Sequence, residues 1–319
     1  MNVKEIYKLA IEQGIKNDPR DKAEISDVLK VAAEKYKKLE KDEKEEFDAE
    51  SLTNPYSDTR ILYDSGKPVK TALVGIDMEV GEVLLAKELE RGGTKIDLLL
   101  SHHPEGVGMT GIADVVDLQA PLFAKHGVPI NIAEGVTLPR IEEVRRRFMP
   151  ANVNRAVDSA RLLNISLVST HTIADNHAYQ FVQNLMDSKK PKTVGDVVKI
   201  LKEVPEFRKA TKDKMGPTIF CGTPERKAGK VAALGFTGGT SSANEVFEKF
   251  AQAGIGTIIE MHMNEEAKKE AEKHNINVVI AGHIASDSLG MNLFLDELEK
   301  KGIKIVPCSG LIRVSRVKR

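Results

Sequence analysis

Apolar residues recur at helical spacing from about Val3 to Phe47, a pattern that predicts two or three amphipathic helices. The charged run over residues 37–46 alternates in sign, which is typical of a solvated helix face rather than a binding tail. Turn-forming residues then gather between Asn54 and Pro68. We therefore expect a helical N-terminal extension over residues 1–66.

The pattern changes after residue 67 to short apolar strands that alternate with amphipathic helices. A helix at 81–91 is flanked by strands at 71–76 and 96–100, and an unbroken apolar second strand is typical of a parallel crossover covered on both faces. The alternation returns later in the chain, with strands at 231–235, 256–261, 278–281 and 303–307 and helices at 242–253, 265–274 and 286–301. The pattern predicts an α/β protein with two lobes, at 67–190 and 191–319, whose mostly parallel sheets are flanked by helices.

The polar candidates for a functional site all follow predicted strands. His102 and His103 come directly after the strand at 96–100, and His171, His283 and the glycine loop at 235–242 follow other apolar runs. Because ligands of open α/β sheets bind at the carboxyl ends of strands, we expect one cleft to collect these residues.

Adjacent histidines form the most unusual string, Ser101-His102-His103-Pro104. Neighbouring residues at a strand end point in different directions, so the two imidazoles could serve two neighbouring metal ions. The alternative is a pair of loop histidines without a ligand. The string alone does not decide between these interpretations.

Two further strings each place an aspartate four residues after a histidine, at His171 and Asp175 and at His283 and Asp287. At this spacing both side chains of a pair can lie on one side of a helical turn. For the first pair the alternative is structural, with Asp175 at the positive end of a helix. Nitrogen and carboxylate donors without thiolates suit zinc, manganese, iron, cobalt or nickel. Since bridging carboxylates are what a two-metal site needs, we predict two divalent metal ions per chain.

In this order, the strings resemble the Nif-three-like dinuclear metal-binding family, many of whose members are labelled GTP cyclohydrolase type 2 homologue. The resemblance covers roughly residues 68–307. It implies that the metal ligands are His102, His103, His171, Asp175, His283 and Asp287.

The sequence also departs from that family. Asp287 stands where the family usually has Glu, Glu105 follows Pro104 where an aliphatic residue is usual, and Thr172-Ile173 replaces Thr-Asn. The family's Trp-Asp-Asn segment near the start is missing, and the first fifty or so residues look like an addition. We therefore expect a divergent member.

A glycine-rich loop between a predicted strand and helix contains Gly235, Gly238, Gly239 and Thr240. Its backbone N–H groups and the helix N-terminus could receive a phosphate, and a simple tight turn is the alternative. The loop is not a Walker motif, because no Gly-Lys-Ser/Thr string occurs in it.

Two residues are candidates to carry protons in catalysis, Glu105 and His262. The string Glu260-Met261-His262 resembles the family's Thr-Gly-acid string, with His262 in place of the acid. The alternative roles for His262 are an extra metal ligand or a group that supports one.

Charge and cysteine content limit the possible partners. The 47 basic and 47 acidic side chains cancel, so no overall field favours nucleic acid or an anionic membrane. The two cysteines, Cys221 and Cys308, lie in no paired-thiol motif, which fits a reducing compartment. No apolar run approaches transmembrane length. We expect a cytoplasmic protein with neither a membrane nor a nucleic-acid partner.

Together these features predict a dinuclear metal-binding protein that acts as a metal-dependent hydrolase on a nucleotide or other phosphorylated small molecule. By resemblance the activity would be GTP cyclohydrolase-like. The alternative is a non-catalytic metal-binding protein with a regulatory or protein-interaction role. The resemblance also implies a homo-oligomer, which we expect to be a hexamer.

Overall fold

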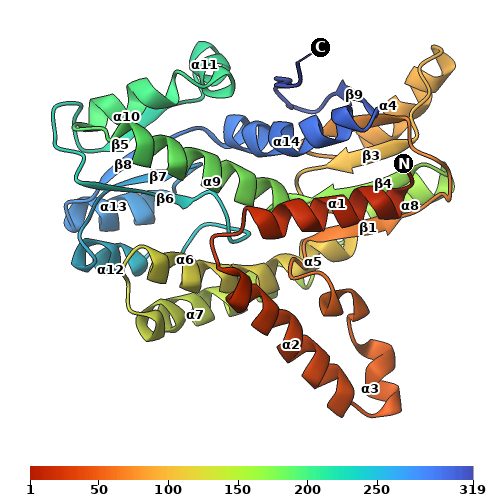
Figure 1. Ribbon diagram of the computed structural model, residues 1–319, viewed down its shortest axis with the longest axis horizontal. Helices are drawn as coiled ribbons and strands as arrows, with labels where there is room; N and C mark the ends of the chain where they lie inside the picture. Colours follow the sequence, from red (N-terminus) through yellow and green to blue (C-terminus); the bar gives the residue numbers. More distant parts are fainter. Residues whose placement is uncertain (319) are drawn as a thin grey trace.

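Two sheets lie at opposite ends of the molecule, and helices α9 (His171–Lys189) and α14 (His283–Lys300) pack against each other between them (Figure 1). The computed structural model describes residues 1–318. One hydrophobic core runs through both sheets and joins Val74, Phe294 and Val279. The predicted α/β class with two mostly parallel sheets is therefore confirmed.

The first sheet has the strand order β1-β4-β3-β2-β9. Its central strands are parallel, and β1 runs antiparallel along the edge. The strands are β1 (Thr59–Tyr63), β2 (Thr71–Gly75), β3 (Leu98–Ser101), β4 (Ser166–Thr170) and β9 (Lys304–Pro307). The helices that follow the first strands in the chain are α4 (Val80–Arg91), α5 (Gly106–Val115), α6 (Gln119–Lys125), α7 (Ile130–Phe148) and α8 (Arg155–Leu162), with a 3₁₀ turn η2 (Val116–Leu118).

The second sheet has the order β5-β8-β7-β6, with β5 antiparallel at its edge. Its strands are β5 (Thr218–Cys221), β6 (Lys230–Gly235), β7 (Ile255–Glu260) and β8 (Asn277–Ile280). The associated helices are α10 (Val194–Leu201), α11 (Pro205–Lys212), α12 (Val246–Gln252) and α13 (Glu265–Lys273).

The last strand, β9, does not lie in the sheet that the sequence predicted for it. The strand predicted at 303–307 was expected in the second lobe, but β9 pairs in parallel with β2 of the first sheet, where Ile305 lies opposite Ala72. The long helix α14 carries the chain back between the sheets before β9 begins. An apolar pattern indicates that a strand is buried, but it does not indicate which strand lies next to it.

The N-terminal residues are only in part an extension. Helix α1 (Val3–Lys16) packs on α9, and its Val3, Ile6 and Ala10 are fully buried in the core. Strand β1 lies where only turns were expected, because a five-residue edge strand between turn formers gives little apolar pattern. Both elements therefore belong to the first lobe.

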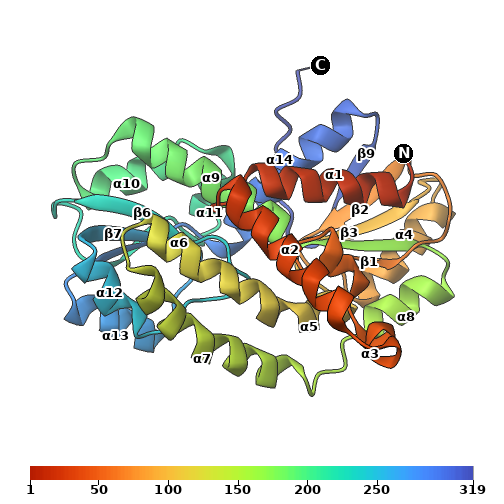
Figure 2. The same ribbon diagram turned by 60° about the horizontal axis from the view of Figure 1, so that its bottom comes forward.

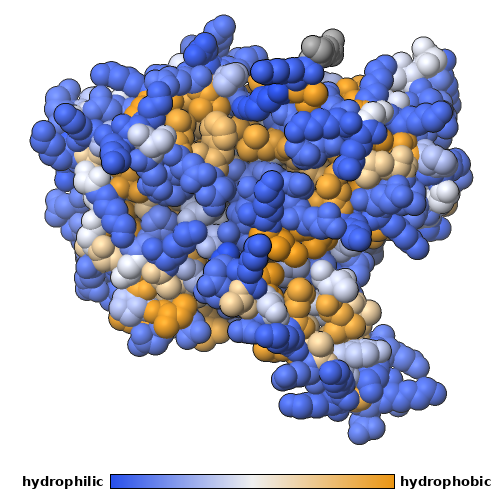
Figure 3. Space-filling model, in the orientation of Figure 1, coloured by the Kyte–Doolittle hydropathy of each residue, from blue (hydrophilic) through white to orange (hydrophobic). Residues whose placement is uncertain are grey.

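Helices α2 (Lys22–Lys38) and α3 (Lys41–Glu46) extend away from the two sheets (Figures 1 and 2). They are followed by the 3₁₀ turn η1 (Ala49–Leu52), against which α2 packs. Ile25 is the one buried residue of α2. Apolar side chains gather where this segment meets the body, and hydrophilic side chains cover its outer end (Figure 3).

No helix within residues 1–318 is both long and apolar enough to cross a lipid bilayer.

Candidate metal centre

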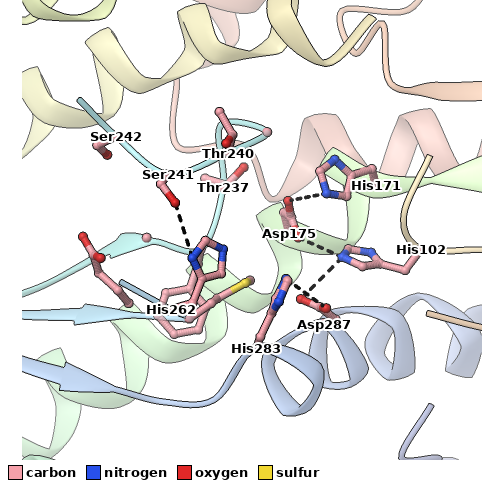
Figure 4. A pocket seen from close by; sticks show the side chains of 15 residues that line it. His102, His171, Asp175, Thr237, Thr240, Ser241, Ser242, His262, His283 and Asp287 are labelled. Carbon is pink, nitrogen blue, oxygen red and sulfur yellow. Dashed lines mark hydrogen bonds and ion pairs between the residues drawn. The ribbon is translucent and has the colours of Figure 1, made fainter. Parts of the chain in front are cut away.

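Three chain segments bring the histidine and aspartate side chains together. His102 and His103 follow β3, while His171 and Asp175 occupy the first turns of α9. The remaining pair, His283 and Asp287, occupies the first turns of α14. Because α9 and α14 start beside the end of β3, their first turns converge with His102 (Figure 4), and the donor atoms of His103 lie in the same cluster.

Gly282 fixes the direction in which α14 begins. Its φ is +106°, and a Cβ there would lie 2.4 Å from the carbonyl oxygen of Met215. Glycine is thus required by the backbone and by this close approach, rather than by a ligand.

Asp287 stands at the centre of the cluster, and its two carboxylate oxygens face different histidines. Oδ1 lies 3.5 Å from Nε2 of His102, and Oδ2 lies 3.5 Å from Nε2 of both His103 and His283. On the other side, Asp175 places Oδ1 3.5 Å from His102 Nε2 and Oδ2 3.8 Å from His171 Nε2. These separations are long for hydrogen bonds. They match the roughly 3.4 Å between donor atoms around a tetrahedral ion with bonds of about 2.1 Å.

The buried donor atoms lack partners. Asp287 is 1% exposed, and within residues 1–318 neither of its oxygens has a hydrogen-bond partner, nor does Nδ1 of His102. A buried carboxylate without hydrogen bonds is costly unless a cation compensates it. Donor atoms within 4.8 Å of one another form three groups, His102–His103–His171, His103–His283–Asp287 and His102–Asp175–Asp287. The donor set therefore fits a divalent metal ion.

The protonation of these groups reflects their burial and proximity. Burial alone would raise the pKa of Asp287, but His102, His103 and the other nearby imidazole, His283, hold it well below its usual value. Burial raises the pKa of Asp175 to about 8 and lowers that of His102 to about 4. His102 is thus neutral near pH 7, the form in which an imidazole binds metal.

Two aspartates that sequence reasoning missed orient the histidines. Asp77 Oδ1 lies 2.8 Å from Nδ1 of His103, and Asp58 Oδ2 lies 2.8 Å from Nδ1 of His171. Thr172 donates a further hydrogen bond to Asp58 at 2.6 Å. With Nδ1 engaged, each imidazole presents Nε2 to the cluster, the arrangement by which carboxylates fix metal-binding histidines.

A signal for both aspartates was present in the strand pattern. Asp77 follows β2 by two residues, which is the same strand-end position that pointed to His102. Asp58 directly precedes β1, and because β1 is antiparallel its start lies at the same edge of the sheet. Finding Asp58 required knowing that β1 existed.

Of the two candidate proton carriers, only His262 lies on the wall of the pocket next to the cluster. Its ring centroid is 4.7 Å from that of His283, and its Nδ1 is 3.3 Å from Oγ of Ser241 (Figure 4). Glu105 instead begins α5 and is not among the residues that line the pocket. Burial, together with Glu79, raises the pKa of Glu105 to about 7.

The glycine loop forms another part of the wall of the same pocket. Gly235, Gly239 and Thr240 line the pocket, but Gly238 faces Gln119, whose Cγ would lie 2.5 Å from an added Cβ. Gln119 Nε2 donates to the carbonyl oxygens of both Gly238 and Thr240. The following helix was predicted from 242 but begins at Val246, so the loop is not at a helix N-terminus. Packing and positive φ angles account for Gly238 and Gly239.

The pocket encloses about 450 Å³, its open mouth included. The residues that line it are His102, His171, Asp175, Gly235, Phe236, Thr237, Gly239, Thr240, Ser241, Ser242, Glu260, Met261, His262, His283 and Asp287. No lysine or arginine of the described chain is among them.

The fold and this cluster define an α/β protein whose histidine and aspartate groups could hold metal. The sequence model of the Duf34/NIF3 (NGG1p interacting factor 3) family matches residues 145–309. The chain therefore belongs to this family, as its motifs predicted. The matched region contains four of the six predicted ligands, His171, Asp175, His283 and Asp287.

A solved structure supports the same fold. A NIF3 superfamily protein from Sphaerobacter thermophilus aligns with a TM-score of 0.71 and 24% identity, over 91% of this chain and 98% of that chain. Reduced HcgD from Methanocaldococcus jannaschii aligns with a TM-score of 0.48 and 17% identity, over 76% of this chain and 84% of that chain. A Bacillus cereus protein related to NIF3 aligns with a TM-score of 0.42 and 12% identity, over 82% of this chain and 92% of that chain. No curated protein matches the sequence. The low identities are consistent with a divergent member.

Proposed function

We propose that the protein is a dinuclear metal-dependent hydrolase that acts on a nucleotide or another phosphorylated small molecule. The observation that carries this proposal is Asp287, a buried carboxylate whose two unpartnered oxygens face different histidines. A carboxylate in that arrangement can join two ions. His102, His171 and Asp175 would complete one side, and His103 and His283 the other.

Divalent ions held there would supply Lewis-acid chemistry to a phosphoryl or carbonyl oxygen and would lower the pKa of a water molecule. The chain's own residues prepare the site for this. Asp58 and Asp77 fix the imidazole orientations of His171 and His103. His262, on the pocket wall, is placed to carry a proton, whereas Glu105 lies outside that wall.

The pocket favours catalysis over a purely structural metal site. A structural site is closed by protein on every side, whereas a catalytic site keeps a position open to water or substrate. Here five of the six proposed ligands also line an open pocket, which continues to the glycine loop: His102, His171, Asp175, His283 and Asp287. A substrate could therefore reach the ions directly, with Gly235, Gly239 and Thr240 on its far side.

The test combines elemental analysis with activity. Protein purified with zinc, manganese, iron, cobalt or nickel present should retain about two ions per chain and hydrolyse at least one compound in a panel of phosphorylated small molecules that includes GTP. Asp287→Asn should lose both properties together, because it removes the negative charge but keeps the shape. Asp187→Asn, an exposed carboxylate on α9, is the matched control and should retain both. A parent protein that binds no metal would refute the proposal.

We also propose that the protein is a cytoplasmic homo-oligomer, with the hexamer of the family resemblance as the expected form. Its support is the exposed apolar face of α2, where Val28 is 38% and Val31 is 65% exposed. Such a face on a projecting helix is stabilised when a second subunit covers it.

A further inference from the structure

Glu260 is the last residue of β7 and lines the same pocket as the metal-binding cluster. It is 7% exposed. Its side chain packs over Gly235 on the neighbouring strand, where an added Cβ would lie 2.7 Å from both Cβ and Cγ of Glu260. Since no positive φ requires glycine at Gly235, this glycine makes room for the glutamate.

The carboxyl group of Glu260 has no protein partner in the described chain. Burial is the sole cause of its altered acidity and raises its pKa to about 8, with no hydrogen bond and no nearby charge to oppose it. No cationic side chain lines the pocket within residues 1–318. Near neutral pH the group is therefore mostly a neutral acid, which presents one O–H donor and one C=O acceptor.

We propose that Glu260 is a ligand-recognition residue whose carboxyl group hydrogen-bonds the N–H and C=O of an amide or lactam group. The inference rests on the proposed function, because the other end of the ligand would reach the metal-binding side chains. An amide matches the donor and acceptor of a neutral carboxylic acid, and an unsatisfied buried polar group gains most from such a partner. A ligand anion could accept from the O–H of the acid, but it would leave the acid's C=O without a donor and would lose its hydration without a cation beside it.

The remaining pocket wall suits the same chemistry. Phe236 and Met261 are buried apolar residues that follow Gly235 and Glu260 in the chain. Thr240 and Ser241 also line the pocket, where the Thr240 hydroxyl oxygen accepts from Arg140 and keeps its own O–H as a donor. A ligand with a flat, uncharged polar group could thus pack its face against apolar side chains while the polar atoms at its edge form hydrogen bonds. The pocket would bind an anionic group at the metal ions and an amide or lactam at Glu260.

Matched pairs of small acids test this assignment. Each pair shares one carboxylate for the metal ions and differs at the distal group: malonamate and malonate, succinamate and succinate, glutaramate and glutarate. Binding is measured by calorimetry to protein loaded with the ion that it retains. For the pair whose length spans the pocket, the parent should bind the amide about tenfold more tightly than the dicarboxylate, the scale of one hydrogen bond to a buried group.

Variants of Glu260 identify the cause of that preference. Glu260→Ala should abolish the preference for the amide. Glu260→Gln, which adds N–H donors, should reduce the preference because the dicarboxylate would bind more tightly. Glu266→Ala, an exposed acid on α13, is the control and should keep the parent's preference. No preference in the parent at any length, or an undiminished preference in Glu260→Ala, would overturn the inference.

Failure of this inference can be separated from failure of the proposed hydrolase. Elemental analysis and acetate binding report the metal ions alone, and neither should change in the Glu260 variants. An amide preference that depends on Glu260, without hydrolysis of any phosphorylated compound, would support the recognition role of Glu260 and refute the proposed hydrolase activity. Hydrolysis without such a preference would support the hydrolase activity and refute the recognition role of Glu260.

Discussion

Asp58 and His171 are 113 residues apart in sequence, yet Oδ2 of the aspartate lies 2.8 Å from Nδ1 of the histidine. The contact joins the segment before the edge strand β1 to the first residue of α9. It means that the N-terminal part of the chain helps to build the proposed metal-binding cluster, although none of the proposed ligands lies there.

We predict that Asp58→Ala lowers metal affinity by about 10- to 100-fold, because an imidazole that loses its orienting carboxylate also loses a fixed direction and some basicity. Competition with a chelator measures the affinity. Asp58→Asn should restore part of it, since the amide oxygen can still accept a hydrogen bond from Nδ1. Asp64→Ala, which removes an exposed carboxylate beyond β1, should have no effect. Equal affinity in parent and Asp58→Ala would contradict this role.

The sequence was sufficient to predict the parts of the fold and site that depend on local pattern. Strand ends could be found from apolar runs, and the rule that ligands bind at strand ends brought His102, His103, His171 and His283 to one place, as the structure shows. The pairing of β9 with β2 could not be predicted, because it depends on the path of α14 rather than on the residues of the strand.

Other features depend on tertiary contacts that leave no local signature. The sequence pattern placed Glu260 at the end of a strand and singled out only His262 beside it. Its packing over Gly235 and its low exposure show that the Glu260 side chain is buried at the pocket. Likewise, Gly238 and Gly239 suggested phosphate binding, whereas a Cβ added at either position would meet Gln119 or Ile112.

We predict that metal affinity increases with pH between about 6 and 8. Burial lowers the pKa of His103, but the nearby carboxylates of Asp287 and Asp77 outweigh this effect and raise the pKa to about 10. The pKa of Asp175 is also raised, to about 8, so both groups hold protons at pH 7 that a metal ion must displace. Calorimetry in buffers of different ionisation enthalpy should detect proton release. Affinity that is independent of pH over this range would exclude these residues as ligands.

We predict that folding stability falls as the pH drops from about 6.5 to about 4, through His177 on α9. Burial, with a contribution from Lys16, lowers its pKa to about 4. The unfolded chain therefore binds a proton at higher pH than the folded chain, so stability is lost as pH falls through this window, by up to about 3 kcal/mol. Thermal unfolding of metal-free protein measures the slope. His177→Leu should reduce this slope but leave the part due to His102 and His126, whose pKa burial also lowers to about 4, while His274→Leu at the end of α13 should not change it.

We predict that Gly290→Ala on α14 reduces both stability and metal affinity. An added Cβ would lie 2.1 Å from the carbonyl oxygen of Ala174 on α9, so the two helices would have to move apart. Asp175 and Asp287 lie beside this crossing, and their separation would change with it. The control is Gly81→Ala on α4, where an added Cβ meets nothing within 4 Å and should stabilise the helix by about 0.5–1 kcal/mol. Chelator competition and melting temperatures compare the two variants.

The last prediction concerns the projecting helices and the assembly. Deleting residues 3–47 would remove the buried core residues of α1, so the contact has to be tested on α2 alone. If its exposed apolar face lines a subunit contact, the double variant Val28→Glu with Val31→Glu should split the oligomer, because burying valine is favourable whereas burying an unpaired carboxylate is costly. Metal content should stay unchanged, since α2 lies outside the cluster. Light scattering measures the mass, and Lys30→Glu, which changes charge on the same helix without removing an apolar side chain, should leave the oligomer intact. A parent protein that runs as a monomer would contradict the predicted assembly, and an intact oligomer in the double variant would place the contact elsewhere.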